Sequence, residues 1–122
     1  DAITPFVDSR MRIKGAADYP RWLRAFVNTY QMIHDEPVVY DIPLLKQKVL
    51  FIMGGNDHNA PGRPFAPENM RGRMGENANL ARALAAKMPN GKAIVFDGIG
   101  HLVHMEAEAK FNAAMLEFLN AR

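Results

Sequence analysis

The chain has 122 residues, of which 48% are hydrophobic and 23% charged, a balance that excludes a wholly disordered or fibrous protein. Lysine and arginine (15 residues) barely exceed aspartate and glutamate (13), and the basic residues are spread along the chain, so we expect no binding to nucleic acid. Cysteine is absent, which excludes disulfides, thiolate metal sites and a cysteine nucleophile within these residues.

The start of the chain shows no targeting signal. Residues 1–5 lack the basic and apolar blocks of a signal peptide, and no apolar run approaches the ~18 residues of a membrane span, so we expect no membrane binding. Because the chain begins at Asp1 and not at a methionine, we expect it to be cut or truncated. The sequence therefore predicts no particular compartment.

The first third of the sequence predicts one amphipathic helix after an irregular start. Residues 1–18 are polar, and they end in Asp18, a good N-cap residue that Pro20 follows in the first helical turn. Apolar side chains then recur at spacings of three and four over residues 22–33. This spacing predicts a helix of about four turns, which ends before Pro37.

Two apolar runs in the remaining sequence predict two buried strands. Residues 49–53 and 93–96 are continuously apolar, which is typical of strands that are covered on both faces of a parallel sheet. Helical spacing over 77–88 predicts a crossover helix between them, and a last helix is expected from about Glu106. Strands that alternate with helices indicate the α/β class with a parallel sheet.

A carboxylate and an imidazole follow the carboxyl ends of these strands. Asp57 ends the segment Gly54-Gly55-Asn56-Asp57 after the first strand, and His101 ends Gly98-Ile99-Gly100-His101 after the second. In open α/β sheets functional residues gather at this edge, so a single crossover should bring the two side chains together. In such a pair the carboxylate holds the histidine in one tautomer while the histidine acts as a general base.

These segments resemble the last third of an α/β-hydrolase. The resemblance rests on Asp41-Ile42-Pro43, on the strand and turn of residues 50–57, and on residues 98–106 with the closing helix. The triad of that superfamily runs nucleophile, acid, histidine in chain order, which implies that Asp57 is the acid and His101 the histidine.

The same resemblance divides the chain into two parts. Residues 1–37 would be part of a helical lid or cap, and residues 38–122 the C-terminal part of the hydrolase core. The lid of that family covers the substrate pocket, which implies substrate-binding roles for Trp22, Phe26 and Tyr30. His104 is a fourth substrate-binding candidate, because it stands three residues after His101 and would line the same pocket. Core packing of the aromatic residues and a structural role for His104 remain open alternatives.

The nucleophile departs from the family pattern. Ser9 is the single serine, and no glycines surround it as a Gly-x-Ser-x-Gly nucleophile elbow requires. We therefore expect the nucleophile and the oxyanion hole to lie outside these residues, and the chain alone to be an inactive fragment. Its expected partner is the N-terminal part of the same enzyme, with self-association as the alternative.

The predicted function is hydrolysis of an ester or related acyl bond in a small-molecule substrate, with no cofactor. An aspartate nucleophile in the missing part would instead give attack on epoxides or alkyl halides. A non-catalytic binding module derived from the hydrolase fold is the alternative from another class.

Two further interpretations concern the loops. His58, His101 and His104 together with Asp57 form a possible zinc cluster, although the strand context explains Asp57 and His101 without a metal. The long loop after the first strand carries several arginines and is expected to be a solvated face, with anion binding for an acidic substrate as the alternative.

Overall fold

The structure is a computed structural model that describes residues 4–121. The chain divides between Val38 and Val39 into two compact units. None of the helices within the described residues is long and apolar enough to cross a membrane.

The first unit contains two helices, α1 (Thr4–Lys14) and α2 (Tyr19–Asp35). The predicted helix is confirmed as α2, with Pro20 in its first turn, although the side chain of Asp18 makes no capping hydrogen bond. The prediction of an irregular start is wrong for α1. Its apolar residues do not line one stripe, so the sequence gives no periodic signal, yet most of its residues are compatible with a helix.

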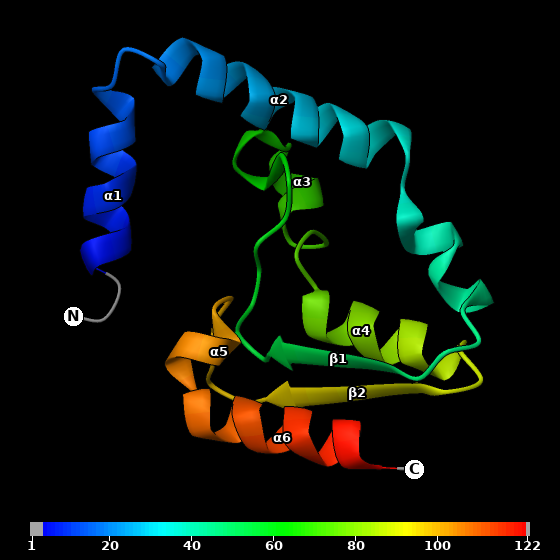
Figure 1. Ribbon diagram of the computed structural model, residues 1–122. Coiled ribbons are helices and arrows are strands. Elements are labelled where there is room, and N and C mark those ends of the chain that lie inside the picture. Colours follow the sequence, from blue (N-terminus) through cyan, green and yellow to red (C-terminus); the bar gives the residue numbers. More distant parts are fainter. Residues whose placement is uncertain (1–3, 122) are drawn as a thin grey trace. The chain divides into compact units, whose positions relative to one another are not determined.

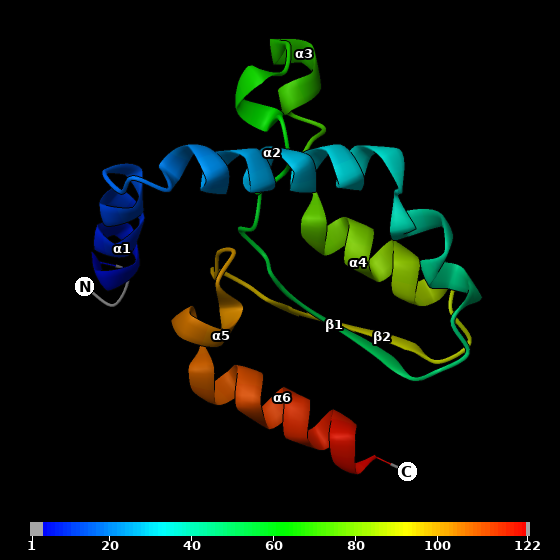
Figure 2. The same ribbon diagram turned by 45° about the horizontal axis from the view of Figure 1, so that its top comes forward.

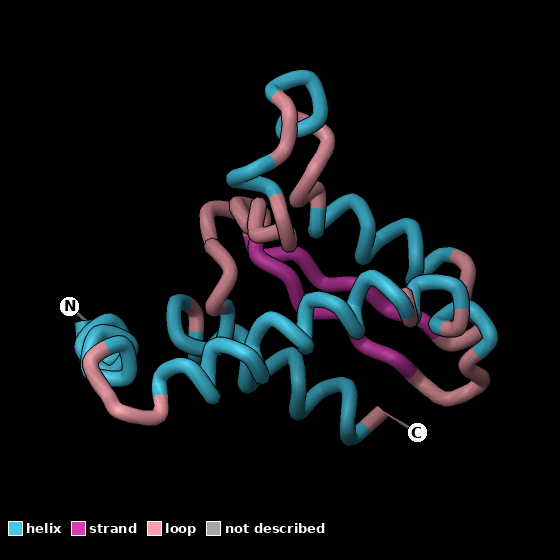
Figure 3. Tube along the Cα trace, turned by 90° about the horizontal axis from the view of Figure 1, so that it is seen from above, coloured by secondary structure: helices cyan, strands magenta, loops and turns pink. Residues whose placement is uncertain are grey.

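The second unit is built around a pair of parallel strands, β1 (Val49–Gly54) and β2 (Gly91–Phe96). They pair in register from Val49 opposite Gly91 to Gly54 opposite Phe96, and Figure 3 shows them side by side. The two predicted strands are therefore confirmed, with β1 longer by Gly54 and β2 longer by Gly91 and Lys92. The parallel direction places both carboxyl ends at one edge of the pair.

Helices cover both faces of this strand pair. The crossover helix α4 (Asn77–Ala86) packs on one face, and α6 (Glu108–Asn120) lies on the other (Figures 1 and 2). The short helix α5 (Val103–Glu106) lies near the carboxyl ends of the strands. Short elements join these parts. They are the 3-10 turns η1 (Val38–Tyr40), η2 (Ile42–Leu44) and η3 (Arg63–Phe65), and the helix α3 (Glu68–Arg71).

The buried core of the second unit is small. Among the described residues its apolar members are Ala81, Leu84, Ala85, Met88 and Val103. Residues of both strands, predicted to be buried on both faces, are mostly half-buried. Each strand pairs with a neighbour on one edge only, so its other edge is open to solvent and its side chains are only partly covered.

We expect residues 1–122 to associate when they are expressed alone. Large apolar side chains stay exposed in the second unit, for example Leu116 at 58% and Leu119 at 66% on α6. Bare apolar patches and unpaired strand edges favour association. Sedimentation velocity should therefore show species larger than one chain. A monomer that unfolds in one cooperative transition would contradict this prediction and favour a self-sufficient binding module.

Candidate functional site

The turn after β1 brings Asp57 to the carboxyl edge of the strand pair. The amide of Gly55 donates to the carbonyl of Phe96 (2.9 Å), and the amide of Asn56 donates to the carbonyl of Ile99 (2.9 Å). These bonds tie the turn after β1 to the turn after β2. A side chain at Gly54 would place its Cβ 2.1 Å from the carbonyl oxygen of Gly100, so glycine is required where the two turns touch.

The turn after β2 presents His101 at the same edge. Gly98 has a φ of +76°, a left-handed conformation that glycine adopts without strain. The carboxylate of Glu106 then accepts hydrogen bonds from the backbone amides of Gly100 (2.8 Å) and Leu102 (3.2 Å). Glu106 thus fixes the backbone on both sides of His101.

Asp57 and His101 form the hydrogen-bonded pair that the topology predicts. The Nδ1 of His101 lies 3.0 Å from the Oδ2 of Asp57. Asp57 is buried, with 3% of its surface exposed, and its Oδ1 accepts a further bond from the amide of Asn59 (2.9 Å). A carboxylate held in this way can orient the imidazole, because its own position is fixed from both sides.

The environment of Asp57 favours the ionised carboxylate. Burial raises the pKa of Asp57, but hydrogen bonds from the His101 side chain, the Asn59 backbone and the Asn77 side chain together lower it below its usual value of 3.8. At neutral pH the group is therefore a carboxylate, which accepts the Nδ1 proton of His101 and leaves Nε2 with its lone pair.

The second ring nitrogen of His101, Nε2, belongs to an exposed side chain and contacts Asn59. The side chain is 57% exposed, and Nε2 lies 3.1 Å from the Nδ2 of Asn59. With the proton on Nδ1, this contact is an amide donating to the single lone pair of Nε2. The lone pair of Nε2 is therefore engaged by Asn59 in this structure.

No known protein family and no curated protein matches this chain. Two solved structures resemble it. A probable hydrolytic enzyme from Pseudomonas aeruginosa PAO1 is 33% identical, with a TM-score of 0.72, over 76% of this chain and 30% of that chain. A predicted CIB-like hydrolase from Thermoplasma acidophilum is 23% identical, with a TM-score of 0.50, over 69% of this chain and 33% of that chain.

The chain thus spans about a third of the length of either protein. The parallel strands, the crossover helix and the closing helix of the second unit agree with this partial match. This chain has the fold of the C-terminal portion of an α/β-hydrolase. The resemblance inferred from the two turns and their strands is confirmed at that level.

The substrate-binding roles predicted for four residues stay predictions. The four residues are Trp22, Phe26, Tyr30 and His104. In the first unit Trp22 stacks on Phe26 (5.1 Å between ring centroids), and Phe26 meets the edge of Tyr30 (5.0 Å). The guanidinium of Arg10 lies 4.9 Å from the centre of the Trp22 ring. In the second unit His104 is exposed on α5 and packs edge-on against Phe111, at 6.0 Å between centroids.

The alternative of a metal cluster finds no support in the geometry. Within residues 4–121, no three His, Asp or Glu side chains gather as metal ligands. The Nδ1 of His58 instead lies 3.1 Å from the carbonyl oxygen of Gly75, and the oxygens of Asp57 are engaged by His101 and Asn59. Among the described residues, Asp57 and His101 therefore pair with each other and with Asn59 and do not form part of a ligand cluster.

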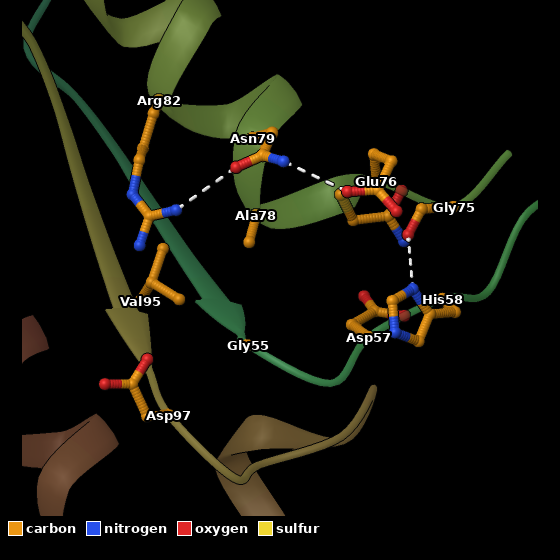
Figure 4. Close-up of a pocket in the computed structure, with 11 residues that line it drawn as sticks. Gly55, Asp57, His58, Gly75, Glu76, Ala78, Asn79, Arg82, Val95 and Asp97 are labelled. Carbon is orange, nitrogen blue, oxygen red and sulfur yellow. Dashed lines mark hydrogen bonds between the residues drawn. The ribbon is translucent and has the colours of Figure 1, made fainter. Parts of the chain in front are cut away.

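A small polar pocket lies beside Asp57, on the side of α4 (Figure 4). Its volume is about 140 Å³, and Arg82 of α4 and Asp97 after β2 contribute opposite charges to it. The Nη1 of Arg82 lies 3.4 Å from the Oδ1 of Asn79. His101 is not among the residues that line this pocket.

Asn59, Asn77 and Glu106 are site residues that the sequence reasoning missed. The Nδ2 of Asn77 donates to the carbonyl of Asn59 (2.8 Å), which holds the segment after Asp57 against the start of α4. One signal was present in the sequence. An aspartate often accepts a bond from the amide two residues later, and Asn59 stands at that spacing from Asp57.

Stability at acid pH should report the ionisation of Asp57. The protein to be measured joins residues 1–122 to the expected nucleophile-bearing segment, and it is called the intact hydrolase below. Because the pKa of Asp57 is lowered in the folded protein, its ionisation stabilises the fold above the unfolded pKa. This stabilisation is lost as pH falls through the folded pKa. The stability difference between wild type and Asp57→Asn should shrink from about pH 6 to about pH 3 in urea unfolding. A stability difference that does not change with pH would contradict this prediction.

Glu106 should act as a positioning residue for His101. In the intact hydrolase, Glu106→Ala frees the amides of Gly100 and Leu102, and we expect kcat to fall about tenfold with little change in KM. Glu106→Gln keeps one acceptor oxygen and should lose less. Equal losses of kcat in both variants, or an effect on KM alone, would exclude a positioning role.

Proposed function

We propose that this chain supplies the acid and the histidine of the catalytic triad of an esterase-like hydrolase. The observation that carries the proposal is the 3.0 Å hydrogen bond between buried Asp57 and the Nδ1 of His101, which leaves Nε2 at the surface. The similarity to solved structures described as hydrolases supports hydrolysis as the reaction class.

The proposed chemistry follows from the orientation of the imidazole. Nε2 of His101 removes the proton of the nucleophile as it attacks the acyl carbon of a small-molecule ester. The Nδ1 proton stays on the imidazole, and Asp57 stabilises the positive charge that develops there. His101 then returns the proton to the leaving alcohol, and a water molecule that His101 activates in the same way releases the acyl group from the nucleophile as the acid. No cofactor takes part in these steps.

The nucleophile and the oxyanion hole are proposed to come from a segment outside residues 1–122. Ser9 is the single serine of the chain and lies on the exposed helix α1, which is not the strand-to-helix elbow that activates a serine. The N-terminal part of the same enzyme is therefore the proposed partner, and its sheet would cover the free strand edges of the second unit.

The first unit is proposed to form part of a lid over the substrate. Phe26 is 37% exposed and Tyr30 43%, so α2 keeps aromatic surface available to an apolar substrate group. Trp22 and His104 are proposed to contact the substrate as well. Core packing against other parts of the enzyme is the competing role for the aromatic residues.

The proposal is tested with three substrate classes on the intact hydrolase and on residues 1–122 alone. We expect the intact protein to hydrolyse 4-nitrophenyl esters, with activity lost in His101→Ala, and the chain alone to show only background hydrolysis. Hydrolysis confined to an epoxide or an alkyl halide would replace the proposed nucleophile by an aspartate. Failure on all three classes would favour a non-catalytic binding module.

A further inference from the structure

A second cavity lies in the long loop between β1 and α4, beside the proposed catalytic pair. Its volume is about 330 Å³, and two arginines and a histidine contribute to its surface. The lining residues are His58, Asn59, Ala60, Arg63, Pro64 and Arg71. No aspartate or glutamate is among them, so the cavity has no carboxylate of its own to neutralise the guanidinium groups.

Arg63 is left incompletely satisfied within the described residues. Its Nε is buried and has no hydrogen-bond partner there. A buried N–H of a charged group without an acceptor is costly, and a ligand oxygen in the cavity would remove that cost. Arg63 thus favours an occupant that brings hydrogen-bond acceptors and negative charge.

Arg71 contributes a second guanidinium, and part of it is already anchored. Its Nε donates to the carbonyl of Ala66 at 2.7 Å, which fixes the side chain at the cavity. A guanidinium held at one edge loses less side-chain entropy when its remaining N–H groups bind a carboxylate. The two arginines therefore suit a planar anionic group that accepts several hydrogen bonds.

Asn59 connects this cavity to the reactive nitrogen of His101. The same residue lines the cavity and places its Nδ2 3.1 Å from Nε2 of His101. His58, another lining residue, directly follows Asp57 in the chain. A group bound among the arginines therefore lies next to the position at which the imidazole would act.

We infer that the cavity binds a carboxylate group of the substrate, so that the substrate class is an ester carrying a free carboxylate. This inference rests on the proposed function, because it assigns the specificity of the same site. In this account Arg63 and Arg71 bind the carboxylate, and Asn59 moves from His101 when the substrate enters.

The inference is tested with a matched pair of esters on the intact hydrolase. The probes are the 4-nitrophenyl monoester of succinic acid and its methyl-capped neutral counterpart. We expect Arg63→Gln to raise KM for the anionic ester by about ten- to a hundredfold and to leave the neutral ester within about twofold. Arg71→Gln should also raise KM for the anionic ester and not for the neutral one, but by a smaller factor. Because Arg71 is exposed, this substitution carries little risk to folding.

Arg73→Gln is the control, since it removes the same charge from an exposed position of the same loop that does not line the cavity. It should change KM for neither ester by more than about twofold. An equal rise of KM for both esters in Arg63→Gln and Arg71→Gln, or an unchanged KM for both esters, would overturn the carboxylate site.

A binding measurement separates this inference from the proposed function. Succinate should bind to the His101→Ala variant, which cannot catalyse hydrolysis, and should bind at least tenfold more weakly to Arg71→Gln, as followed by titration calorimetry. Succinate binding without hydrolysis of any ester would keep the site and refute the hydrolase proposal. Hydrolysis of both esters without succinate binding would refute the site and keep the hydrolase.

Discussion

Replacing His101 with alanine, or Asp57 with asparagine, is expected to lower kcat/KM of the intact hydrolase by a factor of about 10³ to 10⁴. The first change removes the proposed base. The second keeps the size of the side chain, but an amide can donate to Nδ1 and so favours the tautomer that carries its proton on Nε2. The measurement is kcat/KM for a 4-nitrophenyl ester, with cooperative unfolding as the check that each variant folds.

His104 provides the matched control for this prediction. It stands three residues after His101, is exposed, and packs against Phe111 at 6.0 Å between ring centroids. Its change to alanine should therefore lower kcat/KM by no more than about fivefold, the effect of a lost substrate contact. A loss as large as that of His101→Ala would mean that the wrong histidine has been assigned.

The largest expected effect on stability comes from Gly54→Ala. The added Cβ would lie 2.1 Å from the carbonyl oxygen of Gly100 and 2.3 Å from that of Ile99, both backbone atoms that cannot rotate away. The turns that carry Asp57 and His101 would have to separate. We expect a loss of about 3 kcal/mol in the free energy of unfolding, at the upper end of overpacking effects, together with reduced kcat.

Gly72→Ala is the control for this change. Nothing lies within 4 Å of a Cβ at Gly72, and its φ of −66° and ψ of −14° suit any residue. The substitution should leave stability unchanged or raise it by up to about 1 kcal/mol, because alanine restricts the unfolded chain. If Gly54→Ala proved as well tolerated as Gly72→Ala, the two turns would not be in the contact that the structure shows.

The approach of Asp57 to His101 could be predicted because it follows from rules that act along the chain. Apolar runs mark strands, a helical pattern between them marks a crossover, and parallel strands end at one edge. The sequence therefore predicts that residues 44 positions apart meet, and they do so at 3.0 Å. The helices α2 and α4 were predictable for a similar reason, since their apolar side chains repeat with the helical period.

The remaining features depend on tertiary contacts that leave no periodic trace. Glu106 matters because its carboxylate reaches two amides beside His101, and an exposed glutamate at the end of a short helix looks ordinary in the sequence. Asn77 matters through its bond to Asn59, which forms only after the long loop has folded back. Strand burial was overestimated because a continuous apolar run is typical of a strand with neighbours on both edges, and each of the two strands pairs on one edge only.

The most direct test of the catalytic assignment is covalent labelling of the intact hydrolase with a fluorophosphonate, which phosphonylates an activated hydroxyl nucleophile as fluoride leaves. Mass spectrometry of the digested protein should locate the label on a residue outside positions 1–122, with labelling abolished in His101→Ala and retained in His104→Ala. A label on Ser9, or labelling at full rate without His101, would contradict the assignment of Asp57 and His101 to a triad.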